Sequence, residues 1–324
     1  RLLLDEARRA GCTAIVTAHT QDDQAETLLM RLARGSGVDG LSGMQTRTMI
    51  EGIAVVRPLL AVSKARLTAT VQAAGISWQE DPSNGDPRFE RVRIRLAGVA
   101  REALGLTLPQ LARSGRRLSR ARLALDQWTL DFLRHQVELH EGAGACLAED
   151  AFRQIPDEIA LRALRRLLWA FGGQAGPPRL VRVENLLAGL HAGQVAATLG
   201  GCEIVRDAGR VTVFRESGRQ GLAVLPVTPG LPLVWDRRFR ILVTGPLAHA
   251  HERLQVRPLG TAGMRALALL TPTSSPAGRS GPQFAWQAFK SSLNALPRRA
   301  LSTLPSVWNE ARLVAVPAMG RQQP

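Results

Sequence analysis

The sequence contains little cysteine, tyrosine or lysine. Its 324 residues include three cysteines, no tyrosine and two lysines, Lys64 and Lys290. The cysteines are far apart and form no Cys-x-x-Cys pair, so the sequence offers no zinc knuckle, iron–sulfur motif or disulfide framework. A reducing, cytoplasmic setting is therefore the expected environment. The tryptophans are scattered along the chain, so no base-stacking platform is recognisable.

Long apolar runs are also missing. No stretch approaches the roughly 20 apolar residues that a helix needs to span a bilayer, so we expect no membrane segment. The first residues, Arg1-Leu-Leu-Leu-Asp-Glu, form too short an apolar stretch for a signal peptide and include no cleavage site. Because the first residue is Arg1 rather than Met, we expect a chain that is incomplete at its N-terminus.

What the sequence does contain is an excess of positive charge. There are 42 Lys and Arg residues against 27 Asp and Glu residues, and the formal net charge is +15. Cationic side chains that bind phosphates release condensed counterions, so this excess favours a nucleic-acid partner. The excess also has a simpler interpretation, because the scarcity of lysine suggests that arginine usage partly reflects coding bias.

The first hundred residues have the pattern of an α/β unit. Short apolar runs predict buried strands at 12–18 and 53–56. Helices are predicted at 22–34 and 64–74, and each ends at a glycine. Strand and helix therefore alternate, which is typical of an α/β fold.

The character of the chain changes after about Leu104. Leucines recur at helical spacing to about His140, and a second amphipathic helix is predicted at 159–171. A β-hairpin is predicted around Asp207-Ala-Gly209. The predicted domains are 1–100 (α/β), 101–200 (helical), 201–270 (small, with strands), 271–283 (a flexible linker) and 284–324 (a C-terminal segment).

A cluster of acidic residues follows the first predicted strand. Its sequence is His19-Thr-Gln-Asp-Asp-Gln-Ala-Glu26, and the carboxyl ends of strands are where open α/β sheets bind ligands. Asp22 and Glu26 are four residues apart and share a helix face, with Asp23 beside them. Three clustered carboxylates repel one another unless a cation lies between them, which indicates magnesium or an ammonium group. His19 is a candidate for phosphate contact or proton transfer.

The same cluster also has a purely structural interpretation. Asp23-x-x-Glu26 has the pattern of a capping box, and acidic residues in a first helical turn offset the positive end of the helix dipole. Its position after a strand and before Arg31, Arg34 and a glycine-rich loop favours the functional interpretation.

The segment from His19 to Met44 resembles the signature of the tRNA(Ile)-lysidine synthetase family of PP-loop ATP-pyrophosphatases. Two later segments resemble the same family in the same order, Arg57-Pro-Leu-Leu60 and the run from Glu80 to Arg95. The resemblance implies a partial Rossmann-like, parallel-sheet PP-loop ATPase domain. A helical domain and a small mixed C-terminal region are expected to follow it.

The resemblance implies a ligase that modifies tRNA. Such enzymes adenylate the C2 oxygen of the wobble cytidine in the minor isoleucine tRNA with a CAU anticodon, and pyrophosphate leaves. The amine of free L-lysine then displaces AMP and gives lysidine. The implied cofactors are ATP and Mg²⁺, and the implied partners are tRNA(Ile) and lysine.

Site residues follow from the matching motifs. The resemblance implies that Asp22, Asp23 and Glu26 hold the lysine ammonium, with magnesium on Asp22 and Asp23. Arg91 and Arg95 are implied phosphate contacts, because an arginine fork can stabilise charge developing at the α-phosphate. This chain has Val92 where the family usually has Asn. The residues implied to lie near the nucleotide are His19, Arg34, Gly35, Ser36 and Gly37.

Several arginines are candidate tRNA contacts. Four of them recur at helical spacing and predict a basic helix face. A solvated charged face is the commoner explanation of such a run, but the net charge and the implied RNA substrate favour contact with the RNA backbone. The candidate tRNA-binding residues are Arg88, Arg93, Arg113, Arg116, Arg117 and Arg120.

One motif of the family does not occur in this sequence. The family binds pyrophosphate on a Ser-Gly-Gly-x-Asp-Ser loop, where backbone N–H groups face the anion. Ser36-Gly-Val and Ser42-Gly-Met lie in the later loop and are not substitutes. We therefore expect that this chain forms no lysidine alone, and that its parallel sheet is poorly covered.

Two alternatives remain open. A related PP-loop enzyme that thiolates tRNA is one, although the missing Cys-x-x-Cys pair and the Gly-Ser-Gly-Val-Asp-Gly loop weigh against it. The other is a non-catalytic RNA-binding remnant, which would bind tRNA in a salt-sensitive manner without stabilisation by ATP.

Overall fold

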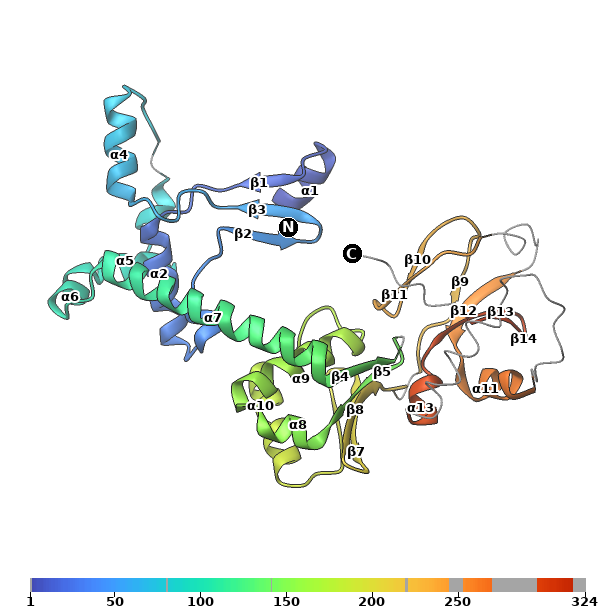
Figure 1. Ribbon diagram of the computed structural model, residues 1–324. Coiled ribbons are helices and arrows are strands. Elements are labelled where there is room, and N and C mark those ends of the chain that lie inside the picture. Colours follow the sequence, from blue (N-terminus) through green and yellow to red (C-terminus); the bar gives the residue numbers. More distant parts are fainter. Residues whose placement is uncertain are drawn as a thin grey trace. The chain divides into compact units, whose positions relative to one another are not determined.

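The computed structural model describes residues 2–79, 81–140, 142–218, 221–244, 253–269 and 296–316. The chain divides into two compact units, Arg1–Asp126 and Gln127–Pro324, and each unit has its own sheets (Figure 1). The linker predicted at 271–283 lies outside the described residues, as do Glu80 and parts of the predicted C-terminal segment. The predicted domain boundaries stay predictions.

A three-stranded sheet organises the first unit. Its strands are β1 (Ala14–Val16), β2 (Arg47–Ile50) and β3 (Ile53–Val56), in the order β1-β3-β2. β1 and β3 run parallel, whereas β2 is antiparallel to β3. The two strands predicted in this region are therefore confirmed. Because β1 and β3 are parallel, their carboxyl ends meet at one edge of the sheet, and His19 and Arg57 follow those ends.

The three strands of this sheet are buried to different degrees. Ile53, Ala54 and Val55 of β3 are buried. Val16 of β1 is 68% exposed, and Met49 of β2 is 57% exposed. β3 is thus buried while its two neighbours are largely exposed, so only part of the sheet contributes to a packed core.

Helices make up most of the rest of the first unit. The predicted helices at 22–34 and 64–74 are confirmed as α2 and α4. α2 lies beside α5, and a core of Ala25, Leu28 and Leu111 joins α2 to α7. The helices are α1 (Leu2–Arg9), α2 (Gln21–Ala33), α3 (Val38–Leu41), α4 (Lys64–Ala73), a 3₁₀ turn (Pro82–Gly85), α5 (Glu90–Leu96), α6 (Gly98–Ala103) and α7 (Leu108–Gln136).

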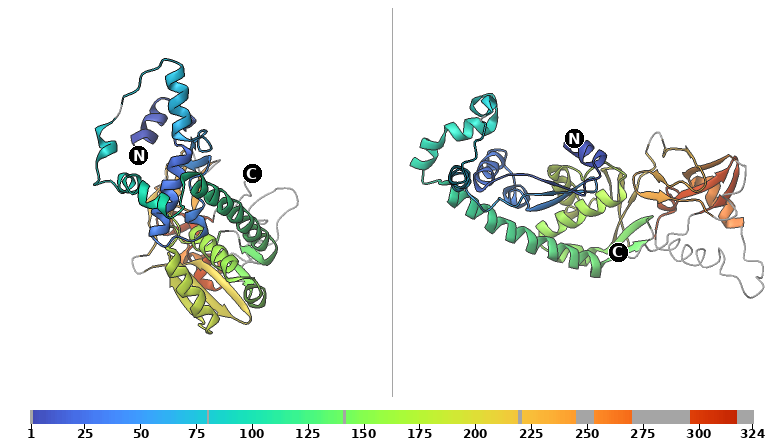
Figure 2. Two further views of the ribbon diagram at one scale, coloured as in Figure 1. Left: turned by 90° about the vertical axis from the view of Figure 1, so that its left-hand side faces the viewer. Right: turned by 90° about the horizontal axis from the view of Figure 1, so that it is seen from above.

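α7 is one long continuous helix (Figure 2). The leucine spacing predicts helix as far as His140, which is wrong for the last four residues. Val137–His140 form β4, which pairs antiparallel with β5 (Gly144–Ala148). Pairing with β5 stabilises the strand more than the leucine spacing favours a helix. The leucine spacing is a local signal, and it does not show that a pairing partner follows in the sequence. Among the described residues, no helix combines the length and the apolarity needed to cross a membrane.

The second unit contains a five-stranded antiparallel sheet in the order β4-β5-β8-β7-β6. Its hairpin between β7 and β8 turns at Ala208 and Gly209, both at positive φ, which confirms the predicted hairpin. The helix predicted at 159–171 is confirmed as α9, whose buried face packs on β8 and α10. The elements are β6 (Ala196–Leu199), β7 (Cys202–Asp207), β8 (Arg210–Arg215), α8 (Glu149–Gln154), α9 (Asp157–Phe171) and α10 (Leu180–His191).

Two smaller sheets follow in the second unit. One has the order β14-β13-β12-β9 and the other pairs β10 with β11. Val256, Val307 and Trp235 form part of the core that these strands share. The elements are β9 (Leu225–Pro226), β10 (Leu233–Trp235), β11 (Phe239–Ile241), β12 (Leu254–Pro258), α11 (Gly260–Leu269), α13 (Arg298–Leu301), β13 (Pro305–Asn309) and β14 (Arg312–Ala315).

A buried group of charged side chains ties these sheets together. Asp236 accepts hydrogen bonds from Arg215 Nε at 3.0 Å and from Arg238 Nε at 2.7 Å. Arg238 also donates to the carbonyl oxygens of Gly142 and Thr303, at 3.2 and 3.3 Å. Asp236 has a φ of +50°, a conformation that Asp and Asn tolerate better than most residues. We call Arg215, Asp236 and Arg238 the sealed cluster.

Candidate active site

Helix α2 begins with a capping box that includes one of the predicted site residues. Thr20 is the N-cap, and its hydroxyl oxygen accepts a hydrogen bond from the backbone N–H of Asp23 at 3.4 Å. The Asp23 carboxylate in turn accepts from the backbone N–H of Thr20 at 2.8 Å. The capping box predicted at Asp23 and Glu26 is therefore wrong, because the helix begins earlier in the chain than that pattern requires. Glu26 lies three residues after Asp23, and its carboxylate bonds to Arg95 and caps no backbone N–H group of the described helix.

Glu26 is buried and paired with an arginine of α5. Its side chain is 5% exposed, and Arg95 Nε donates to Glu26 Oε1 at 2.5 Å. A second bond joins Arg95 Nη2 to Glu26 Oε2 at 3.1 Å, so the pair is bidentate. The hydrogen bond to Glu26 raises the pKa of Arg95, and burial opposes that shift. A bidentate pair of this kind fixes the geometry of both partners.

Asp23 lies between the arginines of α5. Arg91 Nη1 is 3.5 Å from Asp23 Oδ1, and Arg95 Nη2 is 3.8 Å from the same oxygen. The side chains of Arg91 and Arg95 are each 38% exposed, whereas Asp23 is 17% exposed. The carboxylates are thus covered, while the cations that neutralise them reach solvent. We call Asp23, Glu26, Arg91 and Arg95 the open cluster.

Asp22 connects this cluster to α4. Its Oδ2 atom accepts a hydrogen bond from the backbone N–H of Lys64 at 2.8 Å. Lys64 is the first residue of α4, and the first N–H groups of a helix have no partner within the helix. Asp22 therefore satisfies one of these groups, and no described residue bonds to its Oδ1 atom.

His19 lies at the edge of the same group. Its Nδ1 atom is 2.8 Å from the hydroxyl of Thr17. Burial lowers the pKa of His19, the nearby Arg91 and Arg57 lower it further, and Asp23 opposes them. The neutral imidazole is therefore favoured, and no described residue hydrogen-bonds to Nε2.

Several predicted residues are not joined to the carboxylates by any described contact. Arg34 forms an ion pair with Glu90, the first residue of α5. This pair joins the end of α2 to the helix that carries Arg91 and Arg95. Arg88 pairs with Asp86, and Arg93 donates to the carbonyl oxygens of Pro87 and Arg88. The backbone N–H groups of Gly35 and Ser36 donate to the end of α2, and Gly37 O accepts from the backbone N–H of Leu41 in α3.

The predicted basic face of α7 is present in the helix. All four of its arginines are exposed, and none forms an ion pair with an acidic residue in the part of the chain that the structure describes. Four exposed guanidinium groups at this spacing form a stripe along the helix. The arginines are Arg113, Arg116, Arg117 and Arg120.

The structure adds residues that the sequence did not assign. Gln24 Nε2 donates to Met44 O, and Met44 N donates to Gln24 Oε1, both at 2.7 Å. Arg31 Nη1 donates to the carbonyl oxygens of Gly40 and Gly43, at 2.6 and 3.0 Å. The glycine-rich loop is therefore held by α2 and contains the short helix α3. The signal for this role is the spacing of Gln24, Leu28 and Arg31, which places them on one face of α2.

The side chains that are candidate metal ligands lie in and next to the open cluster. Within the described residues, no group of three or more His, Cys, Asp or Glu side chains is arranged to hold a metal ion. Magnesium keeps several waters and needs only one or two protein carboxylates when a phosphate is also bound. Asp22 Oδ1, which has no described partner, fits that role chemically, whereas Asp23 Oδ1 faces the guanidinium groups of Arg91 and Arg95, which a metal ion there would displace.

Comparisons with known proteins agree with one another. A family model described as a PP-loop domain matches residues 1–101. The tRNA(Ile)-lysidine synthase of Ruegeria pomeroyi is 37% identical over 319 residues, which cover 98% of this chain and 68% of that protein. The enzyme of the same name from Bradyrhizobium diazoefficiens is 41% identical over 244 residues, covering 68% of this chain and 67% of its own. The one from Methylobacterium nodulans is 40% identical over 230 residues.

Proposed function

The chain belongs to the tRNA(Ile)-lysidine synthase family, and we propose that it acts as an ATP-dependent ligase that forms lysidine on tRNA. The proposed substrate is tRNA(Ile) with a CAU anticodon, the proposed amine is free L-lysine, and the proposed location is the cytoplasm. One observation carries the proposal: α2 and α5 bring three carboxylates and two arginines together beyond the carboxyl end of β1. The names of the relatives favour lysidine formation over thiolation.

The carboxylates support binding of a lysine ammonium. Asp23 and Glu26 already pair with the guanidinium groups of Arg91 and Arg95, which shows that these carboxylates can bind a cationic nitrogen group. A lysine ammonium that binds Glu26 competes with Arg95 for the same oxygens. Because Arg95 is partly exposed, it has room to leave Glu26 when the amine arrives.

The arginines support binding of a phosphate. We propose that Arg91 and Arg95 stabilise charge that develops on the α-phosphate of ATP while the cytidine C2 oxygen attacks and pyrophosphate leaves. Asp22 and Asp23 would hold Mg²⁺, which when bound neutralises phosphate charge. Neutral His19 presents Nε2 as a hydrogen-bonding group near the reacting atoms. The segment Arg34–Gly37 is proposed to contact the nucleotide.

The tRNA is proposed to lie along the basic face of α7. The exposed guanidinium groups of Arg113, Arg117 and Arg120 suit contacts with a sugar–phosphate backbone, which fix position rather than sequence. Arg116 belongs to the same face. Arg88, just before α5, and Arg93, within it, are proposed to contact RNA close to the reacting nucleotide.

The direct test is transfer of labelled lysine to a tRNA(Ile) transcript. Any incorporation should depend on ATP and on the CAU anticodon, and a transcript with U in place of the wobble cytidine should receive no label. Because the 324 residues contain no Ser-Gly-Gly-x-Asp-Ser segment, and we expect no turnover without one, binding of the transcript is measured separately. A chain that neither labels nor binds the CAU transcript would contradict the proposal.

Salt dependence tests the α7 contacts. Replacing Arg113, Arg117 and Arg120 with Gln should lower the slope of log affinity against log salt by roughly 3, about 1 per phosphate contact. A matched control replaces Arg66, Arg179 and Arg182, which are also exposed and lose the same net charge. Equal slopes for the two triple variants would show that the α7 face is merely solvated.

A further inference from the structure

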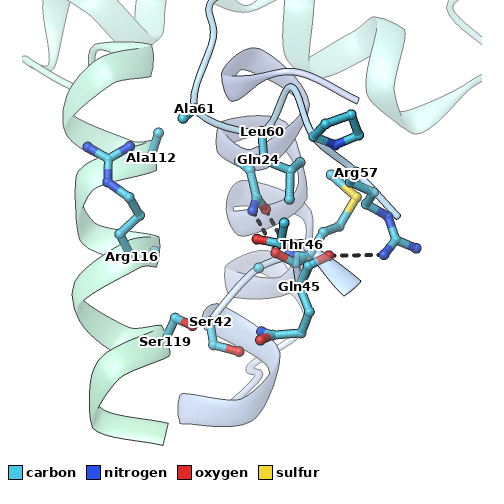
Figure 3. A pocket seen from close by; sticks show the side chains of 14 residues that line it. Gln24, Ser42, Gln45, Thr46, Arg57, Leu60, Ala61, Ala112, Arg116 and Ser119 are labelled. Carbon is cyan, nitrogen blue, oxygen red and sulfur yellow. Dashed lines mark hydrogen bonds between the residues drawn. The ribbon is translucent and has the colours of Figure 1, made fainter. Parts of the chain in front are cut away.

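A pocket of about 340 Å³ lies beside Gln24 of α2 (Figure 3). Gln24, which lines it, is about 160–200° around the helix axis from Asp22 and Glu26, at about 100° per residue. The other walls come from residues 42–46, residues 57–61 and the α7 residues between 112 and 119. The pocket therefore lies on a different face of α2 from Asp22 and Glu26, although Arg57, which lines it, also lies near His19.

The wall formed by residues 42–46 is rigidly held. The two hydrogen bonds between Gln24 and the backbone of Met44 fix the loop against α2. Gly43 has a φ of +72°, and a Cβ atom there would lie 2.5 Å from Gln24 Oε1. Only glycine allows this close approach, so the pocket is formed before any ligand binds.

The polar groups of the pocket suit an anionic ligand with hydrogen-bonding edges. Among the described residues that line it, none is acidic. Arg57 donates from Nη1 to Gln45 O and Thr48 Oγ1 at 3.0 and 3.1 Å, whereas its buried Nε has no hydrogen-bond partner among the described residues. Arg116 is exposed and pairs with no described acid.

The pocket has a polar end and an apolar wall. Ser42, Gln45 and Ser119 gather at one end, while Arg116 lies along α7 toward Ala112 (Figure 3). The side chains of Gln45 and Ser119 hydrogen-bond to no described residue, so they can serve a ligand. Pro58, Leu60 and Ala112 supply the apolar surface. A pocket of about 300 Å³ or more is large enough for one small organic ligand.

We propose that this pocket binds one unpaired nucleotide of the RNA substrate, next to the nucleotide that reacts. Arg116 binds its phosphate, the apolar wall covers the base, and Gln45 and Ser119 bond to the base edge. Arg116 is also part of the α7 basic face, so an RNA strand that follows this face reaches the pocket. RNA loops are commonly recognised through bases that are turned out of the stack in this way. The inference rests on the proposed function, because it takes tRNA as the substrate.

Filling the pocket tests the proposal. The probe is a fluorescent RNA hairpin with the sequence of the CAU anticodon arm, and its affinity is measured by anisotropy with the full chain. Ser119→Leu should weaken binding about tenfold, because it displaces a base that packs in the pocket. Ser114→Leu makes the same change at an exposed position of α7 that does not line the pocket, and it should bind like wild type. Melting curves for both variants report whether each one folds.

Two further variants keep the test independent of how well Ser119→Leu folds. Arg116→Gln should weaken hairpin binding about tenfold and lower the salt slope by about 1, whereas Arg66→Gln on α4 should do neither. Gln45→Ala should weaken binding without changing the salt slope, because the side chain is neutral.

The outcomes separate this inference from the proposed function. A wild-type chain that does not bind the hairpin overturns both. The pocket alone is overturned if the wild-type chain binds the hairpin but neither pocket variant weakens binding. In that case Ser119→Leu has the same affinity as Ser114→Leu, and Gln45→Ala has the affinity of the wild type. Cytidine 5′-monophosphate distinguishes the source of the ligand. If it binds wild type but not Ser119→Leu, while hairpin binding is unchanged, the pocket takes free nucleotides and not RNA.

Discussion

The sealed cluster and the open cluster both pair arginines with carboxylates, but they differ in how far the arginine side chains are exposed to solvent. In the sealed cluster of the second unit, the side chains of Arg238, Asp236 and Arg215 are 4%, 9% and 12% exposed. In the open cluster of the first unit, Glu26 is 5% exposed, but its partner Arg95 is 38% exposed. The carboxylates are covered in both, so the difference lies in the cations.

This difference separates a structural ion pair from an exchangeable one. Arg238 also bonds through both terminal nitrogens to carbonyl oxygens and is only 4% exposed, so a ligand cannot reach its guanidinium. Arg95 has no such second anchor to the backbone among the described residues, and its outer surface is hydrated. Removing an acid should therefore cost folding stability in the sealed cluster and ligand affinity in the open one.

The largest effect is expected in the sealed cluster. Asp236→Asn keeps a residue that tolerates the left-handed backbone but leaves two buried guanidinium groups without their counter-charge. Breaking a buried pair costs about 3–5 kcal/mol, so the free energy of unfolding in urea should fall by about that amount. Glu184→Gln, at an exposed position of α10, is the control and should change it by less than about 0.5 kcal/mol. A loss of the control's size for Asp236→Asn would show that the sealed cluster contributes little.

Glu26→Gln is the matching change in the open cluster. Lysine binding, measured by calorimetry, should weaken about tenfold, because a charge-assisted hydrogen bond to the ammonium is lost. The stability cost should be only about 1 kcal/mol, since the partly exposed Arg95 is hydrated when unpaired. Norleucine, which lacks the side-chain amine, is the ligand control. If Glu26→Gln instead costs as much stability as Asp236→Asn and leaves lysine binding intact, the two clusters do not differ in kind.

The smallest effect concerns pH and His19. Burial, Arg91 and Arg57 lower the pKa of His19 in the folded chain, so the unfolded chain binds more protons between that value and about 6.5. Stability should therefore rise with pH through this window, and His19→Gln should flatten the rise. Urea midpoints measured between about pH 5 and about pH 7.5 test this. His191→Gln should keep the wild-type slope, and a slope that is equally steep in His19→Gln would contradict the assignment.

Local features of the first unit were predictable from its sequence. Apolar runs and glycine stops located β1, β3, α2 and α4, because these signals depend on neighbouring residues. The clustering of Asp22, Asp23 and Glu26 also followed from helical spacing. The roles of these residues in binding lysine and magnesium stay predictions.

Features that depend on distant residues were not predictable. The cation beside Glu26 is Arg95, which is 69 residues away in the sequence, and no local pattern links the two. The capping box was misplaced because the choice between Thr20 and Asp23 as N-cap depends on where the strand before it ends. The pocket beside Gln24 depends on α7 packing on α2, which sequence spacing alone does not encode.

The bond between Asp22 and the amide of Lys64 makes α4 a reporter of what happens at the candidate active site. The carboxylate holds that N–H at 2.8 Å, so the amide hydrogen exchanges slowly only while Asp22 stays in place. A cation that draws Asp22 away removes the acceptor and frays the start of α4. Occupancy of the site is then visible as faster hydrogen exchange at Lys64, in a helix that contains none of the proposed site residues.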